Sequence, residues 1–210
     1  ISINEYGVVQ AKLPRRGNRT KSLGWVAHLD TVDVGLSDKI KPQIIKAYDG
    51  SDVKLNDHEV FSTKDNPEVL SYRGDDIIFT DGTSVLGADN KAAVANIMTS
   101  LWYLKENPEI NHAEIHIAFV PDEEIGLRGA RKIDFDKFKV DYAYTIDCCE
   151  LGELVYETFN AASGSLKIKG VTAHPMSAKG NLVNPIMIAH DFISMLDRAK
   201  MPENTEKREG

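Results

Sequence analysis

Acidic residues and one histidine lie where apolar segments of this sequence end or a helical pattern begins. They are His28 with Asp30, Asp89, the run Asp122-Glu123-Glu124, and Asp147. In open α/β sheets ligands bind beyond the carboxyl ends of the strands, so side chains placed there by separate strands converge in space. One imidazole and several carboxylates form a mixed nitrogen and oxygen ligand set, which suits Zn²⁺, with Mn²⁺ and Co²⁺ as alternatives. Since no Ser/His/Asp arrangement and no Gly-rich phosphate loop competes with it, the pattern predicts a hydrolytic metal site.

Each motif has an ordinary structural explanation when it is considered alone. Asp is a favoured helix cap, so Asp89 after Gly87 predicts a helix N-terminus as readily as a metal ligand. The three consecutive acids fit a solvated turn, although such carboxylates repel one another unless cations are near. His28 and Asp30 face the same side of a strand, and a metal-bound imidazole commonly donates its second N–H to a carboxylate. The recurrence of the pattern at four positions favours a metal site over four unrelated turns.

The elements that position these residues are predicted from hydrophobic periodicity. Alternating or continuous apolar residues predict strands within 1–14, 22–29, 113–120 and 142–146, of which those at 22–29 and 142–146 are of the buried type. Apolar residues at three- and four-residue steps predict an amphipathic helix from Asp89 to the Asn107-Pro108 boundary. This order of strands and helices predicts an α/β fold with a mixed, largely parallel sheet flanked by helices.

Two further segments have their own organisation. Residues 37–80 form an irregular connection with short strand-like pieces, and a connection of this length is more often functional than idle. An alternating strand at 165–171 and an amphipathic helix at 184–196 predict the start of a second unit, which is too small to fold alone. We therefore expect one domain in residues 1–158, incomplete at both ends, and the beginning of a second domain in residues 159–210.

The composition argues against several classes of protein. The chain has 210 residues, of which 42% are hydrophobic, so it can bury a core and is not disordered. A net charge of −7 argues against nucleic-acid binding, and no apolar run approaches the roughly 18 residues of a membrane helix. The only cysteines are adjacent, at Cys148-Cys149, and the amino end shows no secretory signal. These features favour a reducing cytoplasm as its location.

The same motifs, in their order and spacing, resemble the peptidase T family of bacterial tripeptide aminopeptidases, part of the di-zinc aminopeptidase, carboxypeptidase and aminoacylase superfamily. The matching segments are AHLDT, TDGTSVLGADNKA, PDEEIG, YTID, NAAS with AHPMSAKG, and PQIIKAYDGSDVKL. The last segment, in the long connection, points to peptidase T rather than to the superfamily at large. The resemblance implies a zinc-peptidase catalytic domain in residues 1–158 and the start of a lid or dimerisation domain in residues 159–210. It also implies tripeptide substrates and a homodimer formed through the lid.

The resemblance implies the metal ligands as well. His28, Asp89 and Asp147 are expected to hold one zinc ion. Asp89 is expected to bridge to a second zinc ion, which Glu124 also binds. Family members have a non-proline cis peptide bond after the bridging aspartate, so one is expected here between Asp89 and Asn90.

Three further residues acquire roles from the resemblance. Asp30 is expected to orient His28, and Glu123 to take a proton from the attacking water and return it to the leaving amine. His174, in AHPMS, is expected to help polarise the substrate carbonyl; without the resemblance, an exposed loop histidine is its simplest interpretation. The implied reaction releases the N-terminal residue of a tripeptide with water activated by two zinc ions.

Two features depart from the family pattern. Cys148-Cys149 stand where the family commonly has glycines, and we expect them to pack at the strand end rather than to bind zinc. The second zinc ion of the family also needs a histidine from near the carboxyl terminus of a much longer chain, and here it has only Asp89 and Glu124. We therefore expect this polypeptide, as an internal fragment of such an enzyme, to be inactive on its own.

Two alternative functions stay open from the sequence alone. The chain could come from a related di-zinc dipeptidase or amidohydrolase, although the long connection at 37–80 favours peptidase T. It could also be a non-catalytic binding module that retains the fold without metal. The intact set of His28 and the surrounding acids argues against this second alternative.

Overall fold

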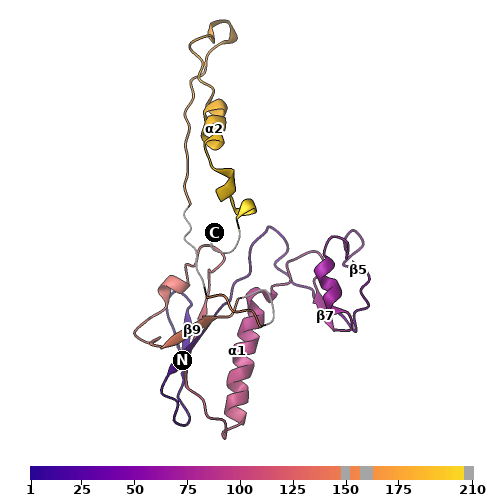
Figure 1. Ribbon diagram of the computed structural model, residues 1–210, viewed down its shortest axis with the longest axis vertical. Helices are drawn as coiled ribbons and strands as arrows, with labels where there is room; N and C mark the ends of the chain where they lie inside the picture. Colours follow the sequence, from indigo (N-terminus) through magenta and orange to yellow (C-terminus); the bar gives the residue numbers. More distant parts are fainter. Residues whose placement is uncertain (148–151, 157–162, 206–210) are drawn as a thin grey trace. The chain divides into compact units, whose positions relative to one another are not determined.

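The computed structural model describes residues 1–147, 152–156 and 163–205 of the chain. The chain divides into two compact units, Ile1–Cys149 and Glu150–Gly210, and each is described by itself (Figure 1). The boundary predicted between residues 158 and 159 lies outside the described residues. Within the described part of the chain, no helix is both long enough and apolar enough to cross a membrane.

A five-stranded sheet forms the centre of the first unit. Its strands, in spatial order, are β1 (Ser2–Ile3), β2 (Val9–Leu13), β8 (Glu114–Val120), β3 (Ser22–His28) and β9 (Tyr142–Thr145). β2 runs antiparallel to both β1 and β8, whereas β3 runs parallel to both β8 and β9. The prediction of an α/β fold with a mixed sheet is therefore confirmed, but the sheet is not largely parallel, since two of the four pairings among its described strands are antiparallel.

The register of β3 brings the ends of three strands together. His28 lies opposite Val120, the last residue of β8, and Val26 lies opposite Thr145, the last residue of β9. The pairing continues past β3, since the N–H of Leu29 donates to the carbonyl oxygen of Val120 at 2.8 Å. Because these three strands run in the same direction, the residues that follow them meet at one edge of the sheet.

Helix α1 (Ala88–Glu106) runs beside the sheet (Figure 1). Its buried residues Ala93 and Ile97 pack into a core with Ala27 of β3 and Ile117 of β8. These small and branched side chains fill the space between helix and sheet, and their burial supplies the main hydrophobic stabilisation of this layer. The predicted helix is confirmed, and its packing fixes its N-terminus close to the ends of the strands.

The N-terminus of α1 has an irregular backbone at the predicted site motif. Gly87 is the N-cap residue, with a φ of 73°, a left-handed conformation that glycine adopts without steric cost. Asp89 and Asn90 follow with non-helical backbone angles. The peptide bond between them is cis, as the family resemblance implies. Asp89 is thus not the helix cap that its position after a glycine suggests.

Strand β9 differs from its prediction in burial. The apolar run at 142–146 predicts a buried strand, but all four residues of β9 are exposed. β9 is the last strand of the sheet and, among the described residues, pairs with β3 alone. A short apolar run does not distinguish a covered strand from an uncovered edge strand, which explains the error.

The connection between β3 and α1 contains a second, small core. Its elements are β4 (Gln43–Ile45), β5 (Val53–Lys54), β6 (Val60–Phe61), the 3₁₀ helix η1 (Pro67–Tyr72) and β7 (Ile77–Phe79). β4 pairs with β7 and β5 with β6, both antiparallel. Tyr48, which is 1% exposed, packs in this core with Val53, Val69 and Phe79, and its hydroxyl donates to the carbonyl oxygen of Ser51 at 2.7 Å. The long connection is therefore a folded segment with its own hydrophobic cluster.

The second unit contains one α-helix among its described residues. This helix, α2 (Pro185–Ser194), confirms the helix predicted at 184–196, and its N-cap Asn184 accepts from the N–H of Ile186 at 3.0 Å. The strand predicted at 165–171 is wrong, because this segment makes a single isolated bridge, from Val171 to Val183. An alternating pattern becomes a strand only where a partner strand pairs with it, and the described residues of this unit provide none. Three short 3₁₀ turns complete the unit: η3 (Pro175–Ser177), η4 (Arg198–Lys200) and η5 (Pro202–Asn204).

The close packing on β3 predicts a cost for any side chain at Gly24. A Cβ atom there would lie 2.6 Å from Cζ of Phe138 and 3.1 Å from the Cβ of Ala143. Phe138 is buried and lies edge-on to the ring of His116, so it has little freedom to move. We predict that Gly24→Ala lowers the free energy of unfolding by about 1–3 kcal/mol, measured by urea denaturation.

Gly164→Ala is the control for this substitution, because a Cβ atom there meets no atom within 4 Å. The control should leave the free energy of unfolding close to that of the wild type. Equal stability of Gly24→Ala and wild type would contradict the packing described here.

Candidate metal centre

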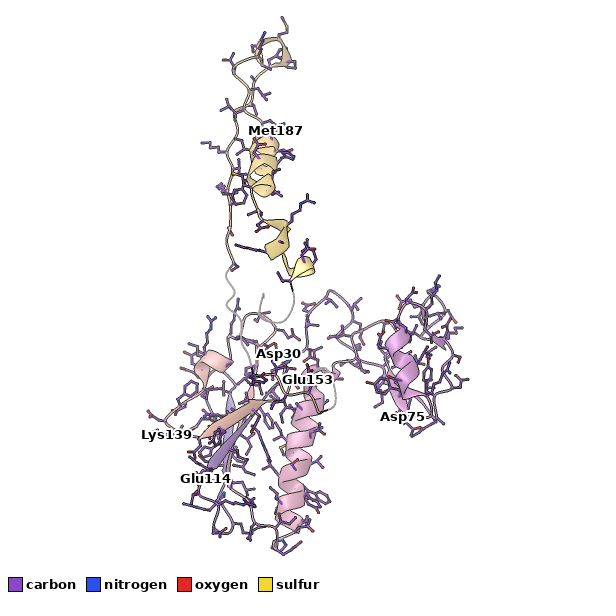
Figure 2. The ribbon with its side chains drawn as sticks, in the orientation of Figure 1. Asp30, Asp75, Glu114, Lys139, Glu153 and Met187 are labelled. Atoms are coloured by element: carbon purple, nitrogen blue, oxygen red, sulfur yellow. The ribbon has the colours of Figure 1, made fainter. Side chains whose placement is uncertain are left out.

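The imidazole of His28 is the buried centre of the predicted site. His28 ends β3 and is 3% exposed. Its Nδ1 lies 3.0 Å from the backbone carbonyl oxygen of Asp30 and 3.4 Å from Oδ1 of the same residue. Because a carbonyl oxygen can only accept, Nδ1 carries a proton and donates it there. Asp30, which lies where the strands of the sheet end (Figure 2), thus orients the ring and leaves Nε2 facing the other way.

Three carboxylates from three different elements lie around the Nε2 atom of His28. Asp89, at the start of α1, places Oδ1 2.9 Å from Nε2. Asp147, just after β9, places Oδ2 at 3.8 Å, and Glu123, just after β8, places Oε2 at 4.0 Å. The structure therefore brings these residues together around one ring, as the pattern of strand ends predicts.

Asp30 also holds the acidic turn that follows β8. Its Oδ1 accepts from the backbone N–H of Glu123 and its Oδ2 from that of Glu124, both at 3.1 Å. Since the Asp30 side chain is 23% exposed, water competes only partly for these bonds. One carboxylate therefore fixes both glutamates relative to the end of β3, which carries His28.

Sequence reasoning missed this second role of Asp30. The donors are backbone N–H groups, which every residue except proline carries, so no residue type in the acidic turn signals the contact. The two-residue spacing from His28 indicates only the contact with the ring. A second tie was also missed, because its partners lie 60 residues apart in the sequence: the ammonium group of Lys91 donates to Oγ1 of Thr31, joining the first turn of α1 to the loop that contains Asp30.

The acidic turn itself has a compact backbone. Asp122 adopts a positive φ of 58°, and the carbonyl oxygen of Glu123 accepts from the N–H groups of Gly126 and Leu127 at 3.1 and 2.9 Å. The chain then continues through the 3₁₀ turn η2 (Ala130–Lys132). The hydrogen bonds to the carbonyl oxygen of Glu123 close the acidic turn directly after Glu124, so both glutamates stay at the end of β8.

The charges of the site shift the pKa values of its members in a consistent way. Burial lowers the pKa of His28, but the carboxylates of Asp147 and Asp89 outweigh burial and raise it above its ordinary value. Burial raises the pKa of Glu123, and among the nearby charges Asp147 raises it further although His28 opposes the shift. The pKa of Asp147 is raised by burial and then by Asp89. The carboxylates thus disfavour one another's ionised form, and a cation between them would relieve this repulsion.

Asp30 behaves differently from the other acids. Burial alone would raise its pKa, but the backbone N–H groups of Glu123 and Glu124 lower it below its ordinary value. These two donors stabilise the ionised carboxylate directly. Asp30 is therefore held as a charged acceptor.

The donor set fits a divalent metal ion. Ligand atoms of His28, Asp89 and Asp147 lie within 4.8 Å of one another, and so do those of His28, Glu123 and Glu124. A metal-bound histidine commonly donates its second ring N–H to a carbonyl or carboxylate, which is what Nδ1 of His28 does. A cation beside Nε2 would satisfy its lone pair and the surrounding carboxylates together. The mixed imidazole and carboxylate donors suit Zn²⁺, Mn²⁺ or Co²⁺.

The remaining predicted residues lie elsewhere in the chain. His174 belongs to the second unit, where it is exposed and its Nδ1 accepts from the N–H of Met176 at 3.2 Å. This bond leaves the proton of the neutral ring on Nε2, so that His174 can donate from there. Cys148-Cys149 lie outside the described residues, and their expected packing stays a prediction.

Two family models match parts of the chain. A model described as M42 glutamyl aminopeptidase matches residues 73–173, which include Asp89, the acidic turn and Asp147. A model described as a peptidase dimerisation domain matches residues 156–207, within the second unit. Both models therefore describe peptidases, and their matches overlap at residues 156–173.

Full sequences extend the comparison over the whole chain. The chain is 54% identical over 212 residues to a peptidase T-like protein of Yersinia pestis and 47% identical over 213 residues to peptidase T of Geobacillus sp. (strain WCH70). The resemblance to peptidase T is confirmed. Both alignments include 100% of this chain but 51% and 52% of the relatives, so the chain spans about half the length of these peptidase T sequences.

Solved structures agree with this similarity. The crystal structure of aminopeptidase PepT from Bacillus cereus ATCC 10987 matches with a TM-score of 0.58 and 25% identity, over 91% of this chain and 43% of that chain. A tripeptidase from Staphylococcus aureus subsp. aureus Mu50 matches with a TM-score of 0.61 and 24% identity, over 95% of this chain and 44% of that chain. This second likeness concerns the fold alone. The fold described above is thus shared with part of the crystal structure of aminopeptidase PepT.

The two bonds from Asp30 to the acidic turn predict an effect on metal affinity. The experiment uses a polypeptide that contains this chain and has the length of the peptidase T relatives, which we call the full-length protein. Asp30→Ala removes the acceptor that holds Glu123 and Glu124, so it should weaken zinc binding by about 10–100-fold. Competition with a chromogenic chelator measures this affinity.

Asp136→Ala is the matched control, because the side chain of Asp136 is 93% exposed and its ion pair is with Lys139, which is not a residue of the site. The control should keep the zinc affinity of the wild type. If Asp30→Ala also keeps it, the acidic turn does not depend on Asp30.

Proposed function

We propose that the full-length protein is a metallo-aminopeptidase that releases the N-terminal residue of tripeptides. The observation that carries this proposal is the buried ring of His28 with three carboxylates around its Nε2 atom. The proposal is further supported by relatives named peptidase T, which match the whole of this chain. The 210-residue chain provides part of the site, and we propose that it is inactive on its own.

We propose that two zinc ions bind at this site, with Mn²⁺ or Co²⁺ as alternatives. His28, Asp89 and Asp147 hold one ion, while Asp89 and Glu124 contribute to the other. When bound, such ions lower the pKa of a water molecule and polarise a carbonyl oxygen. The chain supplies two ligands to the second position, fewer than a sound site needs, which is why the isolated chain is expected to be inactive.

Glu123 is proposed as the residue that moves the proton. Its side chain is 30% exposed, and its backbone is held by Asp30 at the edge of the donor cluster. Glu123 accepts a proton from the water that attacks the first peptide carbonyl. It then donates this proton to the nitrogen of the leaving amine as the C–N bond breaks, so it ends the cycle ionised again.

Two further side chains support this step. Asp30 keeps the Nδ1 proton of His28 in place and thereby directs Nε2 into the site. His174 is proposed to stabilise the developing charge on the substrate carbonyl oxygen through its Nε2–H, which the bond to Met176 leaves as the donor. We also propose a homodimer formed through the second unit, because a peptidase dimerisation domain matches residues 156–207, and a cytoplasmic location.

A substrate panel tests the proposed function. The zinc-loaded full-length protein should hydrolyse Leu-Gly-Gly to leucine and Gly-Gly, and it should cleave Leu-Gly and N-acetyl-Leu-Gly-Gly far more slowly. Product analysis by mass spectrometry measures all three reactions. Faster cleavage of Leu-Gly would show a dipeptidase, and hydrolysis of the acetylated peptide alone would show another amidohydrolase.

The proton transfer assigned to Glu123 gives a sharper prediction. Glu123→Ala should lower kcat for Leu-Gly-Gly by at least about 100-fold, because the water loses its general base. The zinc content should stay that of the wild type, since the other carboxylates and His28 are intact. Steady-state kinetics and elemental analysis measure the two quantities.

Glu109→Gln, at an exposed position after α1, serves as the control and should leave kcat unchanged. Turnover of Glu123→Ala at the wild-type rate would remove the assignment of the base. Loss of zinc together with activity would instead make Glu123 a metal ligand.

A further inference from the structure

A cavity of about 370 Å³ lies beside the metal centre, in the loop that follows Asp30. Its apolar lining is formed by Val32, Val34, Leu36, Ile40 and Val85. The volume falls in the range of small-molecule sites. All of these residues belong to the first unit.

Two contacts place the cavity next to the segments that carry the candidate metal centre. Thr31, which also lines it, directly follows Asp30 and accepts a hydrogen bond from Lys91, two residues after Asp89. On the other side, the Cδ1 atom of Ile40 lies 3.0 Å from the position that a Cβ atom on Gly87 would occupy. Both segments that carry ligands of the proposed metal site therefore border the cavity.

The apolar side chains that line the cavity are partly exposed. Val34 and Leu36 are each 55% exposed, and Val32 and Ile40 are 40% and 39% exposed. The loop is nevertheless tied down, since the N–H of Ser37 donates to the carbonyl oxygen of Thr83 at 3.0 Å. A group of apolar side chains gathered around a cavity is typical of a surface that binds an apolar group.

Two carboxylates accompany this apolar lining. Asp33 and Asp38 also line the cavity, and neither forms an ion pair with a lysine or arginine among the described residues. Oδ1 of Asp33 accepts a hydrogen bond from the N–H of Gly35 at 2.9 Å. An apolar cavity with acidic groups beside it complements a ligand that carries an apolar side chain and a positive charge next to each other.

We propose that this cavity binds the N-terminal residue of the peptide substrate, with its apolar side chain against Val34 and Leu36 and its α-ammonium group toward Asp33 and Asp38. The inference rests on the proposed aminopeptidase function for the identity of the ligand. It goes beyond that function by assigning the residues that select the substrate. An apolar N-terminal residue, such as leucine, is then preferred over glycine.

Binding can be measured without turnover. In full-length protein with ¹³C-labelled valine and leucine methyl groups, L-leucinamide should shift the resonances of Val34 and Leu36. Glycinamide lacks the apolar side chain and N-acetyl-L-leucinamide lacks the ammonium group, so each should shift them at least about tenfold more weakly at equal concentration. Val60, an exposed valine outside the cavity, is the internal control, and its methyl resonances should not shift.

Selectivity can be measured by kinetics. Leu36→Ala should lower kcat/KM for Leu-Gly-Gly by about tenfold while changing that for Gly-Gly-Gly by less than about twofold, because glycine does not reach the apolar wall. Val34→Trp, which fills the cavity, should have the same selective effect. Ile44→Ala removes a similarly exposed apolar side chain outside the cavity and should leave both values unchanged.

The outcomes separate this proposal from the proposed function. Methyl shifts at Val34 and Leu36 in a protein that hydrolyses no tripeptide would support the cavity and refute the aminopeptidase. Tripeptide hydrolysis with unshifted methyl resonances, or with an unchanged ratio of the two kcat/KM values in both variants, would overturn the cavity proposal alone. Equal shifts with N-acetyl-L-leucinamide would overturn the part assigned to Asp33 and Asp38.

Discussion

The contact between the buried ring of His28 and the carboxylates at its Nε2 edge constrains the rest of the first unit. Two carboxylate charges about 4 Å apart repel by about 4 kcal/mol at the effective dielectric constant found near protein surfaces. Three acids around one imidazole therefore need a rigid frame, a cation, or both. The structure supplies the frame, and the donor set is complementary to the cation.

The frame comes from the sheet and from two ties between the segments that follow its strands. One is made by Asp30 and the other by Lys91, which donates to Thr31. Parallel pairing of β3 with β8 and β9 delivers His28, Glu123 and Asp147 to one edge. α1 packs on the same sheet and adds Asp89 from its irregular first turn. Asp30 then fixes the acidic turn through two backbone N–H groups. Each predicted ligand thus rests on an element whose position is set by packing, which is how a site keeps its geometry against internal repulsion.

The parts of this arrangement that depend on residue type could be predicted from the sequence. Apolar runs followed by His28, Glu123 and Asp147 indicate strand ends, and parallel strands bring such ends together. The clamp made by Asp30 could not be predicted, because its donors are backbone groups. The burial of β9 and the strand at 165–171 were predicted wrongly, since cover and pairing depend on neighbours that a local pattern does not contain. The cavity beside the site likewise forms from loop geometry, and residues such as Val34 and Leu36 carry no motif.

Metal content tests the central claim, that the ring of His28 and its surrounding acids form a metal site. The full-length protein, purified without added metal and dialysed against zinc, should contain two zinc ions per chain by elemental mass spectrometry. His28→Ala removes the one nitrogen donor of the cluster, so it should lose at least one of them while keeping the wild-type circular dichroism spectrum. A wild-type protein that retains no metal, or a His28→Ala variant that retains both ions, would contradict the account.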